Sequence, residues 1–171
     1  MLKYFSVKEN KVSCWINPSD FGAHAQSLIF IHGSGSNSSV WSNQYGRLHS
    51  LFNIAALNLP GHGQSTGRSG DDIPAYAEYV KDILVVLDLK RPVLIGHSMG
   101  AAVALCFAAK YPRAISGVMT LGGGVTLPVN PDILQGLKSQ PDMVLDMICK
   151  FSLAKENRYK LSDRKSVVLG N

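Results

Sequence analysis

Short apolar runs alternate along this chain with segments of helical hydrophobic spacing. Strands that are buried on both faces of a parallel sheet read as continuous apolar runs. Runs of this kind cover residues 28–31, 54–59, 92–95 and 115–121. Between them, the pattern predicts helices over residues 40–51, over 73–87 and over 99–111, the last ended by Pro112. Alternating strands and helices predict an α/β domain with a predominantly parallel sheet and flanking helices.

The two ends of the chain differ from this alternating region. Residues 4–7 and 12–16 resemble two strands of a hairpin. After Gly124, two Pro-Asp pairs at 131–132 and 141–142 each begin a helical pattern, and no clear strand follows except for a short run at 166–169. The sequence therefore predicts an N-terminal core over residues 1–125 and a helical segment over residues 126–171.

A Gly-x-Ser-x-Gly motif spans residues 96–100, where a predicted strand meets a predicted helix. A sharp turn between strand and helix strains the backbone and lifts the serine hydroxyl above the sheet. Gly96 and Gly100 avoid clashes there, and the N–H of Met99 at the helix start can stabilise an oxyanion. Ser98 is thus predicted to be a nucleophile. The alternative is a serine that caps an ordinary helix.

Two further turns follow predicted strands, at residues 32–36 and at residues 60–65. With the serine motif they make the chain resemble the α/β-hydrolase family, over residues 28–41, 59–65 and 93–109. The resemblance implies that the loop at Gly33 supplies the second oxyanion N–H, with Ser34 the nearest match. Asn58 stands where family members often carry an acid, which is expected to weaken a local polar contact.

Histidine is the base that a serine nucleophile requires, together with an acid that orients it. In this fold the chain order is Ser, acid, His, but no histidine follows Ser98. His97 is expected to point away from the serine and not to act as the base. The other histidines are interpreted as turn or surface residues: His24, His32, His49 and His62.

The resemblance implies further strands after residue 121 that carry the acid and the base, and these are not recognisable. The segment from Leu127 resembles the start of a helical cap. We therefore expect a truncated or split hydrolase, or an incomplete gene model, in which the strand at 115–121 forms a sheet edge with unpaired backbone groups. The remaining acids show no convincing strand-end position: Asp132, Asp142, Asp146, Glu156 and Asp163.

Composition is typical of a globular protein, with 46% hydrophobic and 17% charged residues. The formal charge of +5 is concentrated in residues 150–171, which hold six bases and two acids. We interpret this basic segment as a solvated helical face and expect no nucleic-acid partner. No apolar run is long enough for a membrane span, and three widely spaced cysteines without a disulfide pattern favour a cytoplasmic protein.

Two functions remain open from the sequence. The first is a serine hydrolase of the esterase or lipase kind, acting on a small-molecule acyl substrate through Ser98 with Ser34 and Met99 forming the oxyanion hole. The second is an inactive module that binds or regulates. Neither a metal-ligand cluster nor a cofactor motif is recognisable, so no cofactor is expected. The sequence indicates neither the substrate nor the oligomeric state.

Overall fold

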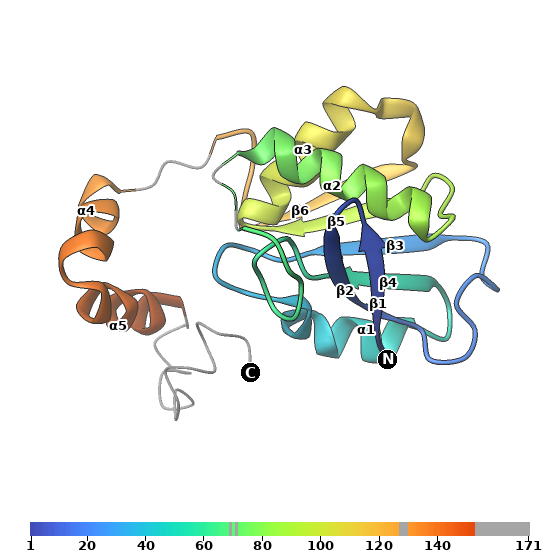
Figure 1. The fold of residues 1–171 in the computed structure, drawn as a ribbon, viewed down its shortest axis with the longest axis horizontal. Coiled ribbons are helices and arrows are strands. Elements are labelled where there is room, and N and C mark those ends of the chain that lie inside the picture. Colours follow the sequence, from blue (N-terminus) through green and yellow to red (C-terminus); the bar gives the residue numbers. More distant parts are fainter. Residues whose placement is uncertain (69, 71, 127–129, 153–171) are drawn as a thin grey trace. The chain divides into compact units, whose positions relative to one another are not determined.

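A six-stranded sheet forms the centre of the larger part of the chain (Figure 1). The structure is a computed structural model that describes residues 1–68, 70, 72–126 and 130–152. The strand order is β1-β2-β4-β3-β5-β6, and the β4-β3-β5-β6 part is parallel. The strands are β1 Leu2–Val7, β2 Asn10–Ile16, β3 Ser27–Ile31, β4 Asn53–Leu57, β5 Val93–His97 and β6 Gly117–Leu121.

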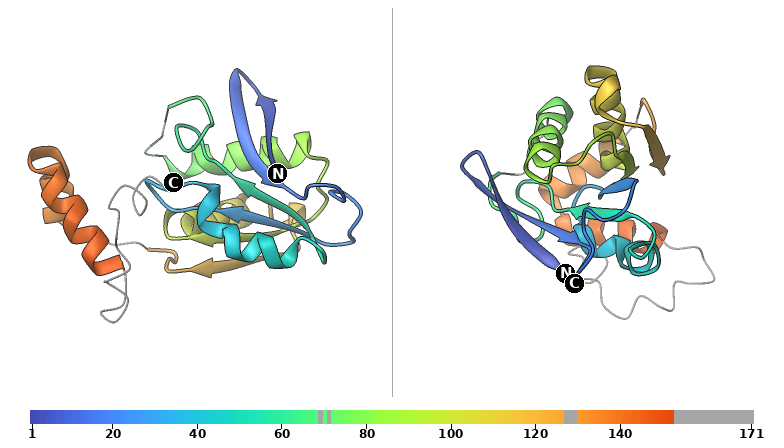
Figure 2. Two further views of the ribbon diagram at one scale, coloured as in Figure 1. Left: turned by 90° about the horizontal axis from the view of Figure 1, so that it is seen from below. Right: turned by 90° about the vertical axis from the view of Figure 1, so that its right-hand side faces the viewer.

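Helices cover both faces of this sheet (Figure 2). The long helices α2 (Ile73–Val86) and α3 (Met99–Lys110) pack on one face, over the larger apolar core. The 3-10 helix η1 (Ser38–Trp41) and helix α1 (Ser42–Leu48) cover the other face, where Trp41 packs on Phe30 with ring centroids 5.0 Å apart. The predicted α/β architecture with a mostly parallel sheet is therefore confirmed.

Two predicted elements differ in extent from the observed ones. The helix expected over 40–51 is split into η1 and α1, because the Asn37 side chain accepts the Ser39 N–H and starts a tighter 3-10 turn. The strand expected from Ile115 begins only at Gly117, after the short 3-10 helix η2 (Pro112–Ala114). The Ile115 side chain is nevertheless buried in the core, which explains why the apolar pattern includes it.

Within the described residues, β6 is the last strand of the sheet and pairs only with β5. Met119 and Leu121 on this strand are 55% and 40% exposed. An edge strand that presents apolar side chains and free backbone groups can pair with another strand. The sequence expectation that this strand forms an edge agrees with the described part of the chain.

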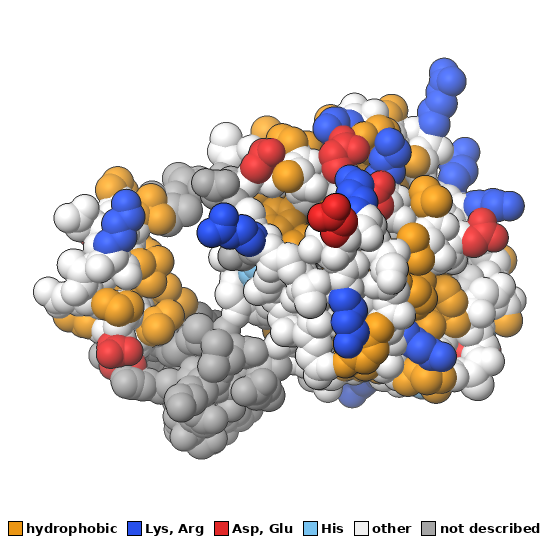
Figure 3. Space-filling view, viewed as in Figure 1, with side chains coloured by type: hydrophobic (Ala, Val, Ile, Leu, Met, Phe, Trp, Pro, Cys, Tyr) orange, Lys and Arg blue, Asp and Glu red, His pale blue; other side chains and the backbone are white. Residues whose placement is uncertain are grey.

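The chain divides into two compact units, residues 1–127 and residues 128–171. In the second unit, α4 (Pro131–Ser139) and α5 (Pro141–Ser152) begin at the two predicted Pro-Asp pairs. Apolar side chains lie on the surface of this helix pair (Figure 3). Leu134 is 52% exposed and Met143 is 61% exposed. None of the helices in the described residues is long and apolar enough to cross a membrane.

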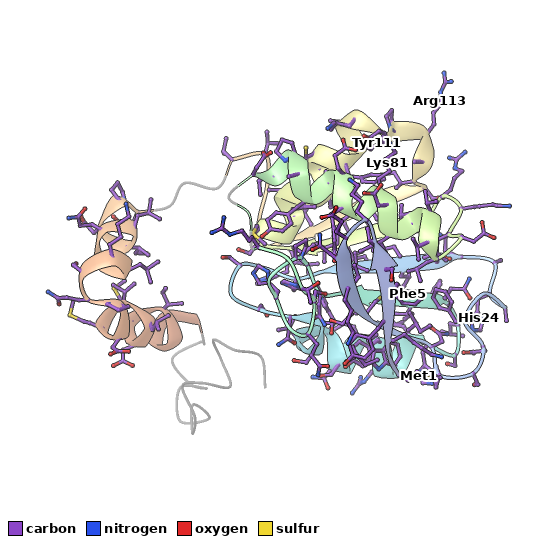
Figure 4. All side chains as sticks on the ribbon, viewed as in Figure 1. Met1, Phe5, His24, Lys81, Tyr111 and Arg113 are labelled. Carbon is purple, nitrogen blue, oxygen red and sulfur yellow. The ribbon has the colours of Figure 1, made fainter. Side chains whose placement is uncertain are left out.

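Side-chain contacts join α2 to α3 and so hold the helix that follows the serine motif. The carboxylate of Glu78 on α2 accepts hydrogen bonds from Lys110 and from the Tyr111 hydroxyl, each at 2.5 Å. Lys81, also on α2, lies 4.8 Å from the centroid of the Tyr111 ring (Figure 4). These contacts supplement the apolar packing of the two helices.

A buried polar network surrounds Asn58, which directly follows β4. The Asn58 amide donates to the Ser13 hydroxyl at 2.7 Å, and the Ser65 hydroxyl donates to the Asn58 backbone carbonyl at 2.8 Å. Because the Ser65 proton is engaged, Ser13 is the donor in the 3.2 Å contact between the two hydroxyls. The Asn58 side-chain oxygen accepts the Ser38 N–H at 2.6 Å, which anchors the end of the loop after β3.

This network corrects the expectation that Asn58 weakens a polar contact. An amide supplies both the acceptor for Ser38 and the donor for Ser13, whereas an ionised carboxylate supplies only acceptors. Asn58 is only 3% exposed and Ser38 only 6%, so without this side chain the buried Ser38 N–H would lose its acceptor, and the Ser13 hydroxyl would keep only its contact with Ser65. Asparagine therefore suits this position, because its amide group both accepts from the Ser38 N–H and donates to the Ser13 hydroxyl.

We predict that Asn58→Asp lowers the free energy of unfolding by about 1–3 kcal/mol at neutral pH, because it removes the donor to Ser13 and buries a charge. Urea denaturation at several pH values measures the change. The loss should shrink at low pH, where a protonated carboxyl regains a donor. Asn37→Asp is the control, since an acid keeps the cap of η1. Equal effects of the two variants would contradict the network.

Candidate active site

Ser98 occupies a sharp turn between β5, which ends at His97, and α3, which begins at Met99. Its backbone has φ 53° and ψ −118°, a conformation that residues with a side chain rarely adopt. The turn is held by the Ser98 N–H, which donates to the Leu121 carbonyl at 2.9 Å, and by the Ser98 carbonyl, which accepts the Ala101 N–H at 2.9 Å. The Ser98 side chain makes no capping bond to α3. This geometry disagrees with the alternative of a helix-capping serine.

Two glycines allow the turn to pack closely. A Cβ atom at Gly96 would lie 2.1 Å from the carbonyl oxygen of Gly100. A Cβ atom at Gly100 would lie 2.3 Å from the carbonyl oxygen of Ile31, at the end of β3. These distances are far shorter than any van der Waals contact, so only glycine fits at both positions. The Gly-x-Ser-x-Gly spacing therefore follows from the packing of α3 against β3 and β5.

The loops after β3 and β6 both lie against this turn. A Cβ atom at Gly33 would lie 3.2 Å from Cβ of Ser98, and one at Gly123 would lie 2.7 Å from the Ser98 carbonyl oxygen. Ser34, the predicted oxyanion residue, is exposed and begins the turn that follows Gly33. The N–H of Met99 belongs to the first turn of α3, where backbone N–H groups have no partner within the helix. The structure thus brings the Gly33–Ser34 loop next to the candidate nucleophile.

His32 was predicted to be a turn or surface residue. It lies in the loop after β3, but its side chain is fully buried, so the surface part of the prediction is wrong. The Leu59 N–H donates to its Nε2 at 3.1 Å, so Nε2 carries no proton. The proton is therefore on Nδ1, which donates to the Gly33 carbonyl at 2.7 Å. Burial lowers the pKa of the imidazole to about 4, and the neutral ring joins the loops after β3 and β4.

Sequence reasoning missed the parts played by His32, Asn58 and Gly123. Gly123 belongs to the run of three glycines that follows β6, and this run could have indicated that the backbone there packs closely against the turn at Ser98. The other two hold the loop after β3 through hydrogen bonds to distant residues, which local sequence patterns do not reveal.

The acids that follow Ser98 lie in the second unit or outside the described residues. Asp132 and Asp142 occupy the first turns of α4 and α5, where negative charge is favoured, and Asp146 lies within α5. Glu156 and Asp163 fall outside the described part of the chain. The residues that the structure describes contain no group of three or more His, Cys, Asp or Glu that could hold a metal ion.

A strained serine at a strand-to-helix turn, on a mostly parallel sheet covered by helices, defines the α/β-hydrolase architecture. The family model described as "alpha/beta hydrolase fold" matches residues 26–159. The chain belongs to this family.

Curated relatives include hydrolases. The chain is 31% identical over 158 residues to the 2-hydroxy-6-oxononadienedioate/2-hydroxy-6-oxononatrienedioate hydrolase of Paraburkholderia phymatum, covering 82% of this chain and 54% of that protein. It is 39% identical over 105 residues to an uncharacterised protein of Mycobacterium tuberculosis, covering 60% of this chain and 31% of that protein. The chain thus spans about a third to a half of the length of these relatives.

Solved structures agree with the assignment. A thermophilic esterase superposes with a TM-score of 0.73 at 29% identity, covering 94% of this chain and 61% of the esterase. E-2-(acetamidomethylene)succinate hydrolase superposes with a TM-score of 0.68 at 25% identity, covering 84% of this chain and 51% of the hydrolase.

We predict that Gly100→Ala lowers the free energy of unfolding by at least about 2 kcal/mol, because its methyl group would collide with the Ile31 carbonyl. Gly46→Ala is the matched control, since a Cβ atom at this position of α1 meets nothing within 4 Å. The control should keep or raise stability by up to about 1 kcal/mol through its better helix propensity. Thermal or urea unfolding compares the two. A Gly100→Ala variant as stable as the control would contradict the packing.

We predict that His32 makes stability depend on pH between about 6.5 and 4. In this range the unfolded chain binds a proton that the buried imidazole does not, so stability falls as pH falls, by up to about 3 kcal/mol. Denaturant titrations of the wild type and of His32→Gln measure the difference. The variant should lose most of this slope. An unchanged slope would show that the His32 imidazole titrates normally in the folded chain.

Proposed function

We propose that this chain carries the nucleophile and the oxyanion hole of a serine hydrolase that acts on an ester or related acyl substrate. The observation that carries the proposal is the strained backbone at Ser98, whose side chain is not engaged in capping α3. The relatives named above support hydrolysis as the reaction class.

In the proposed reaction, Ser98 Oγ attacks the acyl carbonyl and transfers its proton to a general base. The negative charge that develops on the carbonyl oxygen is stabilised by the N–H groups of Ser34 and Met99. Collapse of this intermediate expels the leaving group and forms an acyl-serine ester. Water then hydrolyses the ester and regenerates the hydroxyl.

The general base comes from outside residues 99–171, because this stretch contains no histidine. A serine hydroxyl alone is a weak nucleophile, so the rate depends strongly on that base. This same observation favours a second candidate function, in which the chain is an inactive hydrolase module that binds or regulates. The two functions differ in whether Ser98 reacts with an electrophile.

We propose that residues 126–171, which include the second unit, form a cap-like segment. Helices α4 and α5 of this segment present exposed apolar side chains, as is typical of a surface that binds an apolar partner. The exposed members are Leu134, Leu137, Met143 and Met147.

We predict that a fluorophosphonate probe labels Ser98 of the folded chain slowly, because its phosphorus is a strong electrophile and the start of α3 stabilises negative charge there even without the general base. Ser98→Ala should abolish labelling, whereas Ser42→Ala, at an exposed serine on α1, should leave it unchanged. Intact-mass spectrometry and peptide mapping measure the adduct. Absence of an adduct on a cooperatively folded wild type after prolonged incubation with excess probe would reject the proposal that this chain carries a reactive nucleophile, and it would support the inactive module.

A further inference from the structure

The imidazole of His97 lies between two loops at the end of the sheet. His97 is the last residue of β5 and pairs with Leu121 of β6. A Cβ atom at Gly33, in the loop after β3, would lie 3.2 Å from its Nδ1. One at Gly122, in the loop after β6, would lie 3.4 Å from its Nε2. The two ring nitrogens therefore face one glycine each, and the ring spans the distance between the two loops.

The Gly33 contact links the His97 ring to the nucleophile. The same Cβ position at Gly33 is 3.2 Å from Ser98 Cβ, so the loop, the ring and Ser98 meet at one point. On its other side, the Gly33 carbonyl accepts a hydrogen bond from His32 Nδ1 at 2.7 Å. Gly33 thus lies between two imidazoles, the buried ring of His32 and the exposed ring of His97.

Small displacements of this loop matter for an oxyanion hole. Donors act only when they lie at hydrogen-bond distance from the developing charge, and a shift of about 1 Å can cost on the order of a hundredfold in rate. The loop contains Gly33 and Gly35, the latter with φ 66°, so its own backbone resists displacement weakly. The hydrogen bonds from His32 to the Gly33 carbonyl and from the Ser38 N–H to Asn58 hold the loop on one side, and the His97 ring lies beside Gly33 on the side of Ser98.

We propose that His97 is a positioning residue whose ring holds the Gly33–Ser34 peptide at its distance from Ser98. This inference rests on the proposed function, because it assigns a role within the same oxyanion hole. The ring acts by its shape and not as the general base. Substitutions that keep an atom where Nδ1 lies should therefore preserve the function.

The chain offers a graded set of variants for this test. His97→Ala removes both glycine contacts. His97→Asn keeps a polar atom near the position of Nδ1 and hence the contact to Gly33, whereas His97→Gln extends toward Gly122 and loses it. His49→Ala is the control, because this histidine follows α1, before β4 begins, and contacts the Trp15 ring.

The second-order rate constant for fluorophosphonate labelling at Ser98 is measured in the 171-residue chain. His97→Ala should lower it by about 10- to 100-fold. His97→Asn should restore most of the rate, with a pH profile of unchanged shape, and His97→Gln should restore less. Wild-type rates in His97→Ala, or equal losses in the alanine and asparagine variants, would overturn the proposal. If the labelling rate lost its dependence on pH in both His97→Ala and His97→Asn, His97 would be the general base and the positioning role would be wrong.

A second measurement does not depend on labelling. Backbone ¹⁵N relaxation gives the order parameters of the Gly33 and Ser34 amides, which should fall from about 0.85 toward 0.6 in His97→Ala and stay high in His97→Asn. Unchanged order parameters in His97→Ala would overturn the positioning role even if wild-type Ser98 reacts. A wild type that is not labelled but shows this loosening would reject the proposed function and keep the inference that His97 orders the loop.

Discussion

The left-handed backbone turn at Ser98 is the constraint on which the rest of the site depends. A residue with a side chain adopts this conformation only when its surroundings hold it there, at a cost of about 1–3 kcal/mol. Here the Ser98 N–H donates to the carbonyl of Leu121 in β6, and the Ser98 carbonyl accepts the N–H of Ala101 in the first turn of α3. Gly96 and Gly100 let the neighbouring backbones approach to distances that no side chain would allow. The strain is thereby offset by the packing of the sheet against α3.

Buried polar groups extend this constraint to the neighbouring loops. His32 joins the loop after β3 to the loop after β4, and Asn58 joins both to β2 through Ser13. These side chains are almost fully buried, and most of their polar atoms have partners. Loops usually move more than the elements that they connect. In this molecule, hydrogen bonds between distant segments hold the loop that is proposed to stabilise the oxyanion.

Much of the fold was predictable because apolar runs and helical spacing report directly on burial. The strands β3, β4 and β5 and the helices α2 and α3 were predicted to within a few residues, and so was the turn at Ser98. The roles of His32 and Asn58 were not predictable, because their partners lie about 20 to 45 residues away in sequence. The division of the predicted helix into η1 and α1 depends on the capping side chain of Asn37, which the spacing of apolar residues does not reveal. Local patterns thus predict elements, while long-range polar contacts appear only in three dimensions.

The central claim is that the Ser98 hydroxyl and the N–H groups of Met99 and Ser34 converge on one reacting centre. The most direct measurement is a crystal structure of the chain after reaction with a small phosphonate. We expect a covalent bond from Ser98 Oγ to phosphorus, with the phosphoryl oxygen about 2.7–3.1 Å from both N–H nitrogens. An adduct whose phosphoryl oxygen faces solvent, or an adduct on another residue, would contradict it.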